Sequence, residues 1–86
     1  MKIKVTREDI VQGEVKNGSR CPVARALKRE FGENIFNDSP NGVHEEEVTI
    51  NRKSYELSKR AREFIRMFDK KMSVRPFNFI IKGLKK

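Results

Sequence analysis

The sequence predicts one small α+β domain whose long elements follow the order β-α-β-β-α-β, with an extra short helix before the first long one. Its 86 residues are enough for a single domain and one apolar core. Two stretches place apolar residues at helical spacing, and four short segments alternate apolar with polar residues or pair as a hairpin. This order is compatible with a ferredoxin-like sandwich, in which two helices cover one face of a small sheet.

The chain is expected to begin with a strand and a short helix. Residues 1–5 alternate apolar side chains with lysines, which is the period of a half-buried strand. Thr6, followed by Arg7-Glu8-Asp9, is typical of a helix N-cap with acids in the first turn. We expect this helix to end near Gly13 and a turn to follow at Asn17-Gly18-Ser19.

The first long helix is predicted to start after Cys21, because proline is favoured at the first helical position and Pro22 stands there. Gly32 is a suitable C-terminal stop. At 100° per residue, one side of this helix is apolar and consists of Val23, Ala24, Leu27 and Phe31. The opposite side is basic and consists of Arg25, Lys28 and Arg29.

A long connection, residues 33–46, is predicted to be loosely ordered. It contains a turn sequence, Ser39-Pro40-Asn41-Gly42, and runs into the acidic segment 45–47. Connections of this length in small domains are either functional or loosely ordered, and the absence of any chemical motif favours loose order.

A β-hairpin is predicted over residues 48–57. A two-residue turn at Asn51-Arg52 places Ile50 opposite Lys53 and Val48 opposite Tyr55, so that the apolar faces of the two strands agree.

The second long helix is predicted to follow Ser58 as its N-cap and to break before Val74-Arg75-Pro76. Its apolar side consists of Ala61, Phe64, Ile65 and Phe68, and its basic side of Lys59, Arg62, Arg66 and Lys70. A last strand is expected over residues 77–81, and residues 82–86 are expected to be a frayed basic tail.

The positive charge is concentrated in the second half of the chain. The net charge is +8; residues 1–43 hold 8 Lys/Arg and 6 Asp/Glu, a net of +2, and residues 44–86 hold 12 and 6, a net of +6. Such a charge distribution attracts nucleic acid, an acidic protein surface or anionic lipid.

The two basic helix sides are the candidate anion-binding site. If both helices pack on the same face of the sheet, their cations can form one continuous surface able to neutralise several phosphates. The alternative is that these side chains are ordinary solvated helix exteriors. The residues concerned are Arg25, Lys28, Arg29, Lys59, Arg62, Arg66 and Lys70.

Base recognition has little support in the sequence. Sheets that stack on RNA bases expose aromatic side chains, whereas Tyr55, Phe77 and Phe79 fall on the same side as the core residues. If nucleic acid is bound, we expect contacts mainly to phosphates, with little sequence preference.

Catalytic and metal-binding functions are not favoured. Cys21 lies at a predicted helix N-terminus, where the dipole can lower the pKa of a thiol, but the only histidine, His44, lies in the loose connection. A capping or packed role for Cys21 is the favoured interpretation. One cysteine and one histidine cannot build a zinc site, and no phosphate-binding or dinucleotide motif occurs, so we expect no metal and no cofactor.

The location expected from the sequence is cytoplasmic. One cysteine cannot form an internal disulfide, no secretory signal is visible, and no apolar run approaches the ~18–20 residues of a membrane span. The sequence leaves the oligomeric state open.

Three segments together resemble short uncharacterised proteins of bacteriophages and prophages: CPVARAL at 21–27, AREFIRMFD at 61–69 and RPFNF at 75–79. The resemblance implies a phage or mobile-element origin and action in the cytoplasm of an infected bacterium. It carries no known activity and therefore no functional residue. Two functions stay open: a non-enzymatic accessory protein that binds nucleic acid, and an inhibitor or adaptor that binds an acidic surface of a host protein.

Overall fold

A computed structural model describes residues 2–84 and confirms the α+β class. The predicted helices and strands are present, and most begin and end within one or two residues of their expected bounds. The second long helix is the exception, because it ends at Asp69, well before the predicted break at Val74-Arg75-Pro76. One strand, β2, was not predicted. In chain order the elements are β1 (Lys2–Val5), α1 (Arg7–Gln12), α2 (Pro22–Phe31), β2 (Gly42–Val43), β3 (Glu47–Ile50), β4 (Lys53–Glu56), α3 (Lys59–Asp69) and β5 (Phe77–Ile80).

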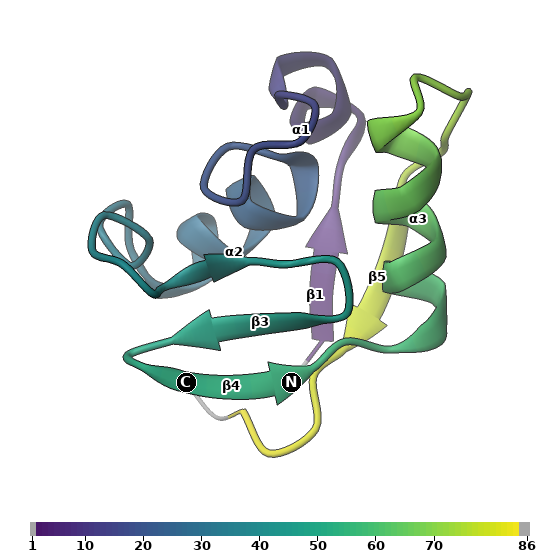
Figure 1. The fold of residues 1–86 in the computed structure, drawn as a ribbon. Coiled ribbons are helices and arrows are strands. Elements are labelled where there is room, and N and C mark those ends of the chain that lie inside the picture. Colours follow the sequence, from purple (N-terminus) through teal and green to yellow (C-terminus); the bar gives the residue numbers. More distant parts are fainter. Residues whose placement is uncertain (1, 85–86) are drawn as a thin grey trace.

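The single sheet of a ferredoxin-like sandwich is not what the structure shows. The described strands form two antiparallel sheets, a two-stranded ribbon β1-β5 and a three-stranded sheet β2-β3-β4. The two sheets run across one another instead of continuing side by side (Figure 1). The reason lies in β4, where Lys53, Ser54 and Glu56 are exposed and only Tyr55 is half-buried. A strand without a buried face is suited to the edge of a sheet and not to its centre.

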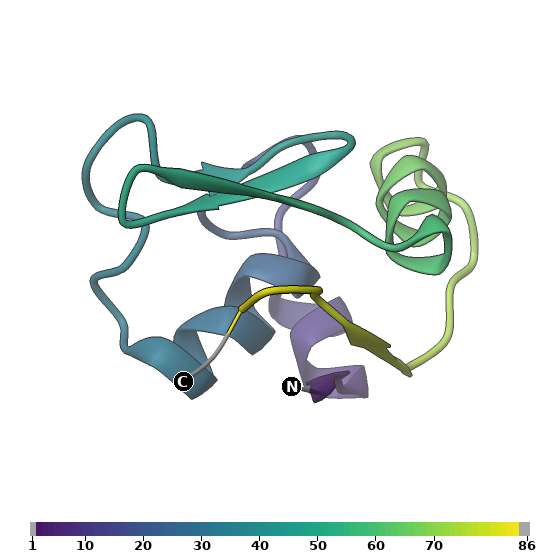
Figure 2. The ribbon, with the colours of Figure 1, turned by 90° about the horizontal axis from the view of Figure 1, so that it is seen from below.

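The core lies between the three-stranded sheet and the ribbon. Viewed from below, the three-stranded sheet forms one layer, and α1, α2 and the ribbon lie beneath it (Figure 2). Helix α3 runs beside β5 and closes the flank (Figure 1), with the ring centroids of Phe64 and Phe77 4.6 Å apart. The inward side chains include Ile3, Val5, Val23, Leu27, Val48, Ile50, Phe64, Ile65, Phe77 and Phe79.

The hairpin forms in the predicted register. Val48 lies opposite Tyr55, and Ile50 lies opposite Lys53. The turn residues Asn51 and Arg52 both have positive φ, 52° and 65°. Two consecutive positive φ values are typical of the type I′ turn, whose twist matches that of the strands it joins.

The predicted helix caps are also confirmed. Thr6 Oγ1 accepts a hydrogen bond from Asp9 N at 3.2 Å, and Thr6 N donates to Asp9 Oδ2 at 2.9 Å, which is a capping box. Ser58 Oγ accepts from Ala61 N at 3.2 Å at the start of α3. Gly32 has a backbone φ of 114° at the end of α2, a conformation that residues other than glycine rarely adopt.

The connection predicted to be loose is partly structured. Phe36 is buried in the core, and Gly42–Val43 forms β2 by pairing with Thr49 and Val48. Thr49, whose side chain lies on the other face of β3 from Val48 and Ile50, is also buried. It pairs with Gly42 of β2, and its hydroxyl lies 3.2 Å from Ser54 Oγ. A two-residue strand lies below the length at which apolar periodicity can be recognised, so the sequence did not predict it.

The predicted frayed tail is wrong at Leu84. Leu84 is buried against the core, and its N–H approaches the carbonyl oxygen of Ile81 at 3.4 Å. The remaining tail residues, Lys85 and Lys86, lie outside the described part of the chain. Within residues 2–84, no helix has the length and apolar character needed to cross a membrane.

Candidate anion-binding surfaces

The basic side of α2 is largely neutralised by α1. The guanidinium of Arg29 donates to both carboxylate oxygens of Asp9, at 3.0 and 2.8 Å, and to the backbone oxygen of Lys4 at 2.8 Å. Arg25 Nε lies 3.5 Å from Asp9 Oδ1, and its Nη2 lies 3.9 Å from Glu8 Oε1. Two of the three cations predicted as an anion site on this helix therefore already have an anionic partner inside the protein.

Asp9 is the centre of that network. Its side chain is fully buried, and burial alone would raise its pKa. The hydrogen bonds from Arg29 and from Thr6 N, together with the positive charge of Arg29, outweigh this effect and hold the pKa of Asp9 below its usual value of 3.8. Asp9 is therefore ionised at neutral pH, and Arg29 is held in a structural role.

The basic side of α3 differs from that of α2 in its exposure and in its ion pairs. Lys59, Arg66 and Lys70 are exposed, and Arg62 is half-buried. Across residues 2–84, none of these four forms an ion pair with a carboxylate within 4.0 Å, and the buried Nε of Arg62 has no hydrogen-bond partner. Their charge is thus available to an external anion.

The structure does not bring the two basic sides together. Arg25, Lys28 and Arg29 line a groove beside α1, and Arg66 and Lys70 line a separate groove with no lining residue in common. The two helices pack in different places: α2 lies with α1, whereas α3 flanks β5 (Figures 1 and 2). The condition for one continuous surface, packing of both helices on the same face of one sheet, is not met.

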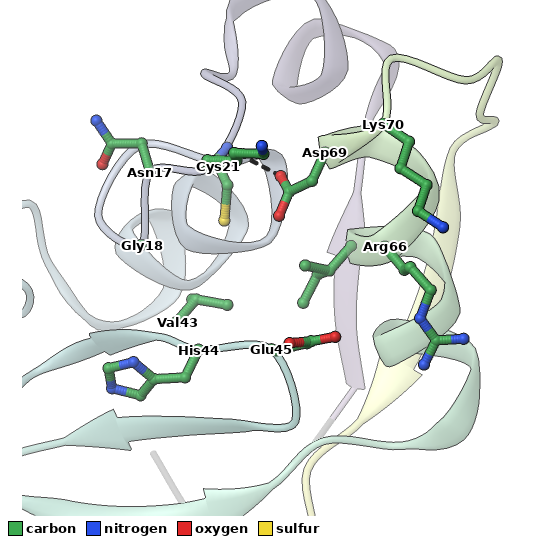
Figure 3. Close-up of a pocket in the computed structure, with 11 residues that line it drawn as sticks. Asn17, Gly18, Cys21, Val43, His44, Glu45, Arg66, Asp69 and Lys70 are labelled. Carbon is green, nitrogen blue, oxygen red and sulfur yellow. Dashed lines mark hydrogen bonds between the residues drawn. The ribbon is translucent and has the colours of Figure 1, made fainter.

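The groove beside α3 has a volume of about 670 Å³ and carries mixed charge. It lies between the loop after α1, the β2–β3 connection and α3. Asp69 points toward that loop and accepts a hydrogen bond from Lys16 N at 2.9 Å (Figure 3). Arg66 and Lys70 point away from Cys21, toward the outside of α3 (Figure 3). With Glu45 and Asp69 among its lining residues, this groove does not favour an anion strongly.

Cys21 caps α2, as the favoured interpretation of the sequence expects. Its Sγ accepts a hydrogen bond from Ala24 N at 3.4 Å, and the residue is buried. Burial raises the pKa of the Cys21 thiol to about 11, because desolvation outweighs the lowering effect of the backbone N–H groups of Ala24 and Val23. His44 lines the same groove, but its ring points away from the thiol (Figure 3).

A second basic surface was missed by the sequence analysis. Three adjoining grooves run along the ribbon and the flank of α3, sharing Asn78, Phe77 and Arg60 at their borders. Their lining residues include one acid, Glu63, and six cations, a net charge of +5 out of the +8 of the chain. We call this surface the ribbon face, and its cations are Lys2, Lys4, Arg7, Arg60, Arg75 and Lys82.

A signal for the ribbon face did exist in the sequence. The alternation of residues 1–5 and 77–81 places Lys2, Lys4 and Asn78 on the side opposite the core, as the structure confirms. What the alternation could not show is that β1 and β5 are neighbours, with Lys2 opposite Ile80 and Lys4 opposite Asn78. Without that pairing, the cations at the two ends of the chain could not be assigned to one surface.

Comparison with protein-family models, with curated proteins and with solved structures gave no match. In the part of the chain from 2 to 84, no three His, Cys, Asp or Glu side chains lie together in a way that could hold a metal ion. Residues 2–84 form a small α+β protein with two crossed antiparallel sheets. Among these residues, the cations of α3 and of the ribbon face have no carboxylate partner within 4.0 Å.

Proposed function

We propose that this chain is a small non-enzymatic protein that binds nucleic acid through phosphate contacts with little sequence preference. The resemblance to phage proteins places its action in the cytoplasm of an infected bacterium, as part of the same proposal. The observation that carries the proposal is the outer side of α3, where Lys59, Arg62, Arg66 and Lys70 have no carboxylate partner among the described residues.

Physical chemistry favours this use of the cations over a merely solubilising one. A protein that places several cations on phosphates releases condensed counterions, and this release supplies most of the free energy of non-specific binding. Cations already paired within the protein, such as Arg29, contribute little because the internal pair must first be broken. The unpaired cations of α3 carry no such cost.

The test compares the double variant Arg66→Ala/Lys70→Ala with the matched control Arg20→Ala/Lys53→Ala, which removes the same charge outside α3 and outside the ribbon face. Both residues of the test pair are exposed, so folding should be unaffected. Fluorescence anisotropy with a labelled polynucleotide at several salt concentrations should show weaker binding of the test pair, equally across sequences. The slope of log K against log salt should fall by about 1.8 in magnitude, since each lost phosphate contact removes about 0.9.

Absence of binding by the wild-type chain at low salt would refute the proposal. Equal losses in the test and control variants would indicate a general charge effect without a role for α3.

The alternative, an inhibitor or adaptor that binds an acidic host protein, is supported by a different observation. Val11, Met72 and Ile80 are large apolar residues with exposed fractions of 69%, 53% and 56%. Apolar side chains within a charged surface are typical of protein interfaces. A pull-down from bacterial lysate, with and without nuclease, separates the two functions: a discrete partner that survives nuclease favours the protein-binding function, and loss of every partner favours nucleic acid.

A further inference from the structure

The ribbon face consists of one side of a two-stranded antiparallel ribbon. Ile3, Val5, Phe77 and Phe79 point into the core, so the alternate residues point outward. The outward pairs across the ribbon are Lys2 with Ile80 and Lys4 with Asn78. No helix or strand covers this side, and none of its lysines forms an ion pair with a carboxylate in the part of the chain that the structure describes.

The cations of the ribbon face fall into two groups at opposite ends of the ribbon. Lys2 and Lys82 line one groove, at the end where β1 begins and β5 ends. Arg60 lines this groove and also that of Arg75, and its guanidinium lies 5.6 Å from the ring centroid of Phe77, so it belongs to neither end alone. Lys4 and Arg7 line another groove at the other end, where Val5 pairs with Phe77. Arg75 belongs to this second end, because it stands two residues before β5 begins. Between the two groups lie the uncharged side chains of Asn78 and Ile80.

The separation of the two groups suits a duplex groove. A strand rises 3.3–3.4 Å per residue, so Lys2 and Lys4 are about 7 Å apart along β1, whereas Arg75 and Lys82 flank the four residues of β5, which alone span roughly 10–13 Å. The major groove of B-DNA is about 12 Å wide and admits a two-stranded β-ribbon. A ribbon seated on the groove therefore brings one cation group to each of the two phosphate backbones that border it.

The side chains between the two groups favour a duplex over a single strand. Surfaces that bind single-stranded nucleic acid carry exposed aromatic rings for base stacking, whereas Phe77 and Phe79 are both buried.

The side chains of the ribbon face also favour DNA over a membrane. Interfacial binding needs a broad apolar surface, and the exposed large apolar side chains lining the ribbon face are limited to Ile80 and Met67.

We infer that the ribbon face seats on the major groove of duplex DNA, with its two cation groups on the facing phosphate backbones. The inference rests on the proposed function and deepens it: it names the nucleic acid, the groove and a contact surface distinct from the outer side of α3. Phosphate contacts position the ribbon. Of the two side chains that face the base edges, only Asn78 can donate and accept hydrogen bonds, and Ile80 makes apolar contacts alone, so sequence preference is limited to about one base pair.

The experiment measures anisotropy with a labelled duplex and with a single strand of the same sequence and length. Two double variants each remove one cation pair. Lys2→Ala/Lys82→Ala removes it at one end of the ribbon, and Lys4→Ala/Arg75→Ala removes it at the other. All four side chains are exposed, so the fold should be retained, which circular dichroism checks. Each variant should lower the salt slope on duplex DNA by about 1.8, whereas Arg20→Ala/Lys53→Ala should leave it near the wild-type value.

The groove is tested with two further probes. Netropsin, which occupies the minor groove, should not displace the protein. A duplex whose cytosines carry a bulky substituent at C5, which projects into the major groove, should bind at least tenfold more weakly than the unmodified duplex.

The outcomes separate the two proposals. If the wild-type chain binds no nucleic acid at low salt, both fail. If it binds but the ribbon variants behave like the control while Arg66→Ala/Lys70→Ala loses affinity, the ribbon inference fails and the function stands. Tighter binding to the single strand, displacement by netropsin, or indifference to the C5 substituent would each overturn the ribbon inference alone. Binding to phosphatidylglycerol vesicles without binding to the duplex or the single strand would overturn both proposals.

Discussion

Replacing Arg29 with alanine tests whether this residue supports the fold or binds an anion. The sequence predicts it as part of an anion-binding surface, but its guanidinium makes two hydrogen bonds to the buried carboxylate of Asp9. Arg29→Ala removes both bonds and leaves the carboxylate in place. We therefore expect a loss of stability with no loss of affinity for nucleic acid.

The size of the loss follows from the contacts that remain. Removing one partner of a buried ion pair costs about 3–5 kcal/mol when the other charge is left uncompensated. Here only Asp9 is buried, whereas the Arg29 side chain is 46% exposed and partly screened by solvent. Thr6 N also still donates to Asp9, and Arg25 remains 3.5 Å away, so the cost is smaller. We expect a decrease of about 2–3 kcal/mol in the free energy of unfolding, which corresponds to a decrease of roughly 10–20 °C in Tm for a domain of this size.

The pH dependence gives a second, independent readout. In the wild type, the pKa of Asp9 lies below 3.8, so its contribution to stability is present above that pH and is lost as the pH falls through the lowered pKa. Without Arg29, burial dominates and the pKa of Asp9 rises above 3.8. The difference in unfolding free energy between wild type and variant should therefore be largest near neutral pH and should narrow below about pH 4.

Urea denaturation followed by circular dichroism, repeated from pH 3 to pH 7, measures both effects. The double variant Asp9→Asn/Arg29→Ala is the control, since Asp9→Asn should cost less in the absence of Arg29 than in the wild type. A loss of less than about 0.5 kcal/mol that does not vary with pH would show that the Asp9–Arg29 pair does not stabilise the fold.

Two further predictions concern the loop that connects α1 to α2 and packs against β2. Because burial raises the pKa of the Cys21 thiol to about 11, only about 0.1% of the thiol is ionised at pH 8. Alkylation of Cys21 by iodoacetamide should therefore be at least 100-fold slower than alkylation of a free thiol. Fast alkylation in the native state would refute this prediction. Gly18→Ala should destabilise the chain by about 1–3 kcal/mol in thermal unfolding, because a Cβ at this position would lie 2.6 Å from the backbone oxygen of Val43; an unchanged Tm would show that the loop moves freely away from β2.

Local structure was predictable where a short segment contains its own signal. Thr6 and Ser58 begin helices because their side chains accept backbone N–H groups within the same turn. The hairpin register follows from the positions of Val48 and Ile50 relative to a two-residue turn. Each of these features depends on residues no more than seven positions apart, and for this reason the sequence alone contains them.

The arrangement of those elements was not predictable in the same way. The ribbon pairs Lys2 with Ile80, and Arg29 reaches across to Asp9; neither contact leaves a periodic pattern in the sequence. The candidate site changed accordingly. Two predicted cations of α2 proved to have internal partners, while Lys2, Lys4 and Lys82, which the alternation had placed outward, proved to share one surface.

The pairing of β1 with β5 also determines the order in which the strands can pair during translation. Within the described strands, β5 is the sole hydrogen-bonded neighbour of β1. During translation, β1 therefore waits without a strand partner until residues 77–80 have left the ribosome, while the β3–β4 hairpin can close on its own much earlier. A nascent chain stalled before Phe77 would present the unpaired backbone edge of β1 to chaperones, and deletion of either terminal strand would leave the other unpaired.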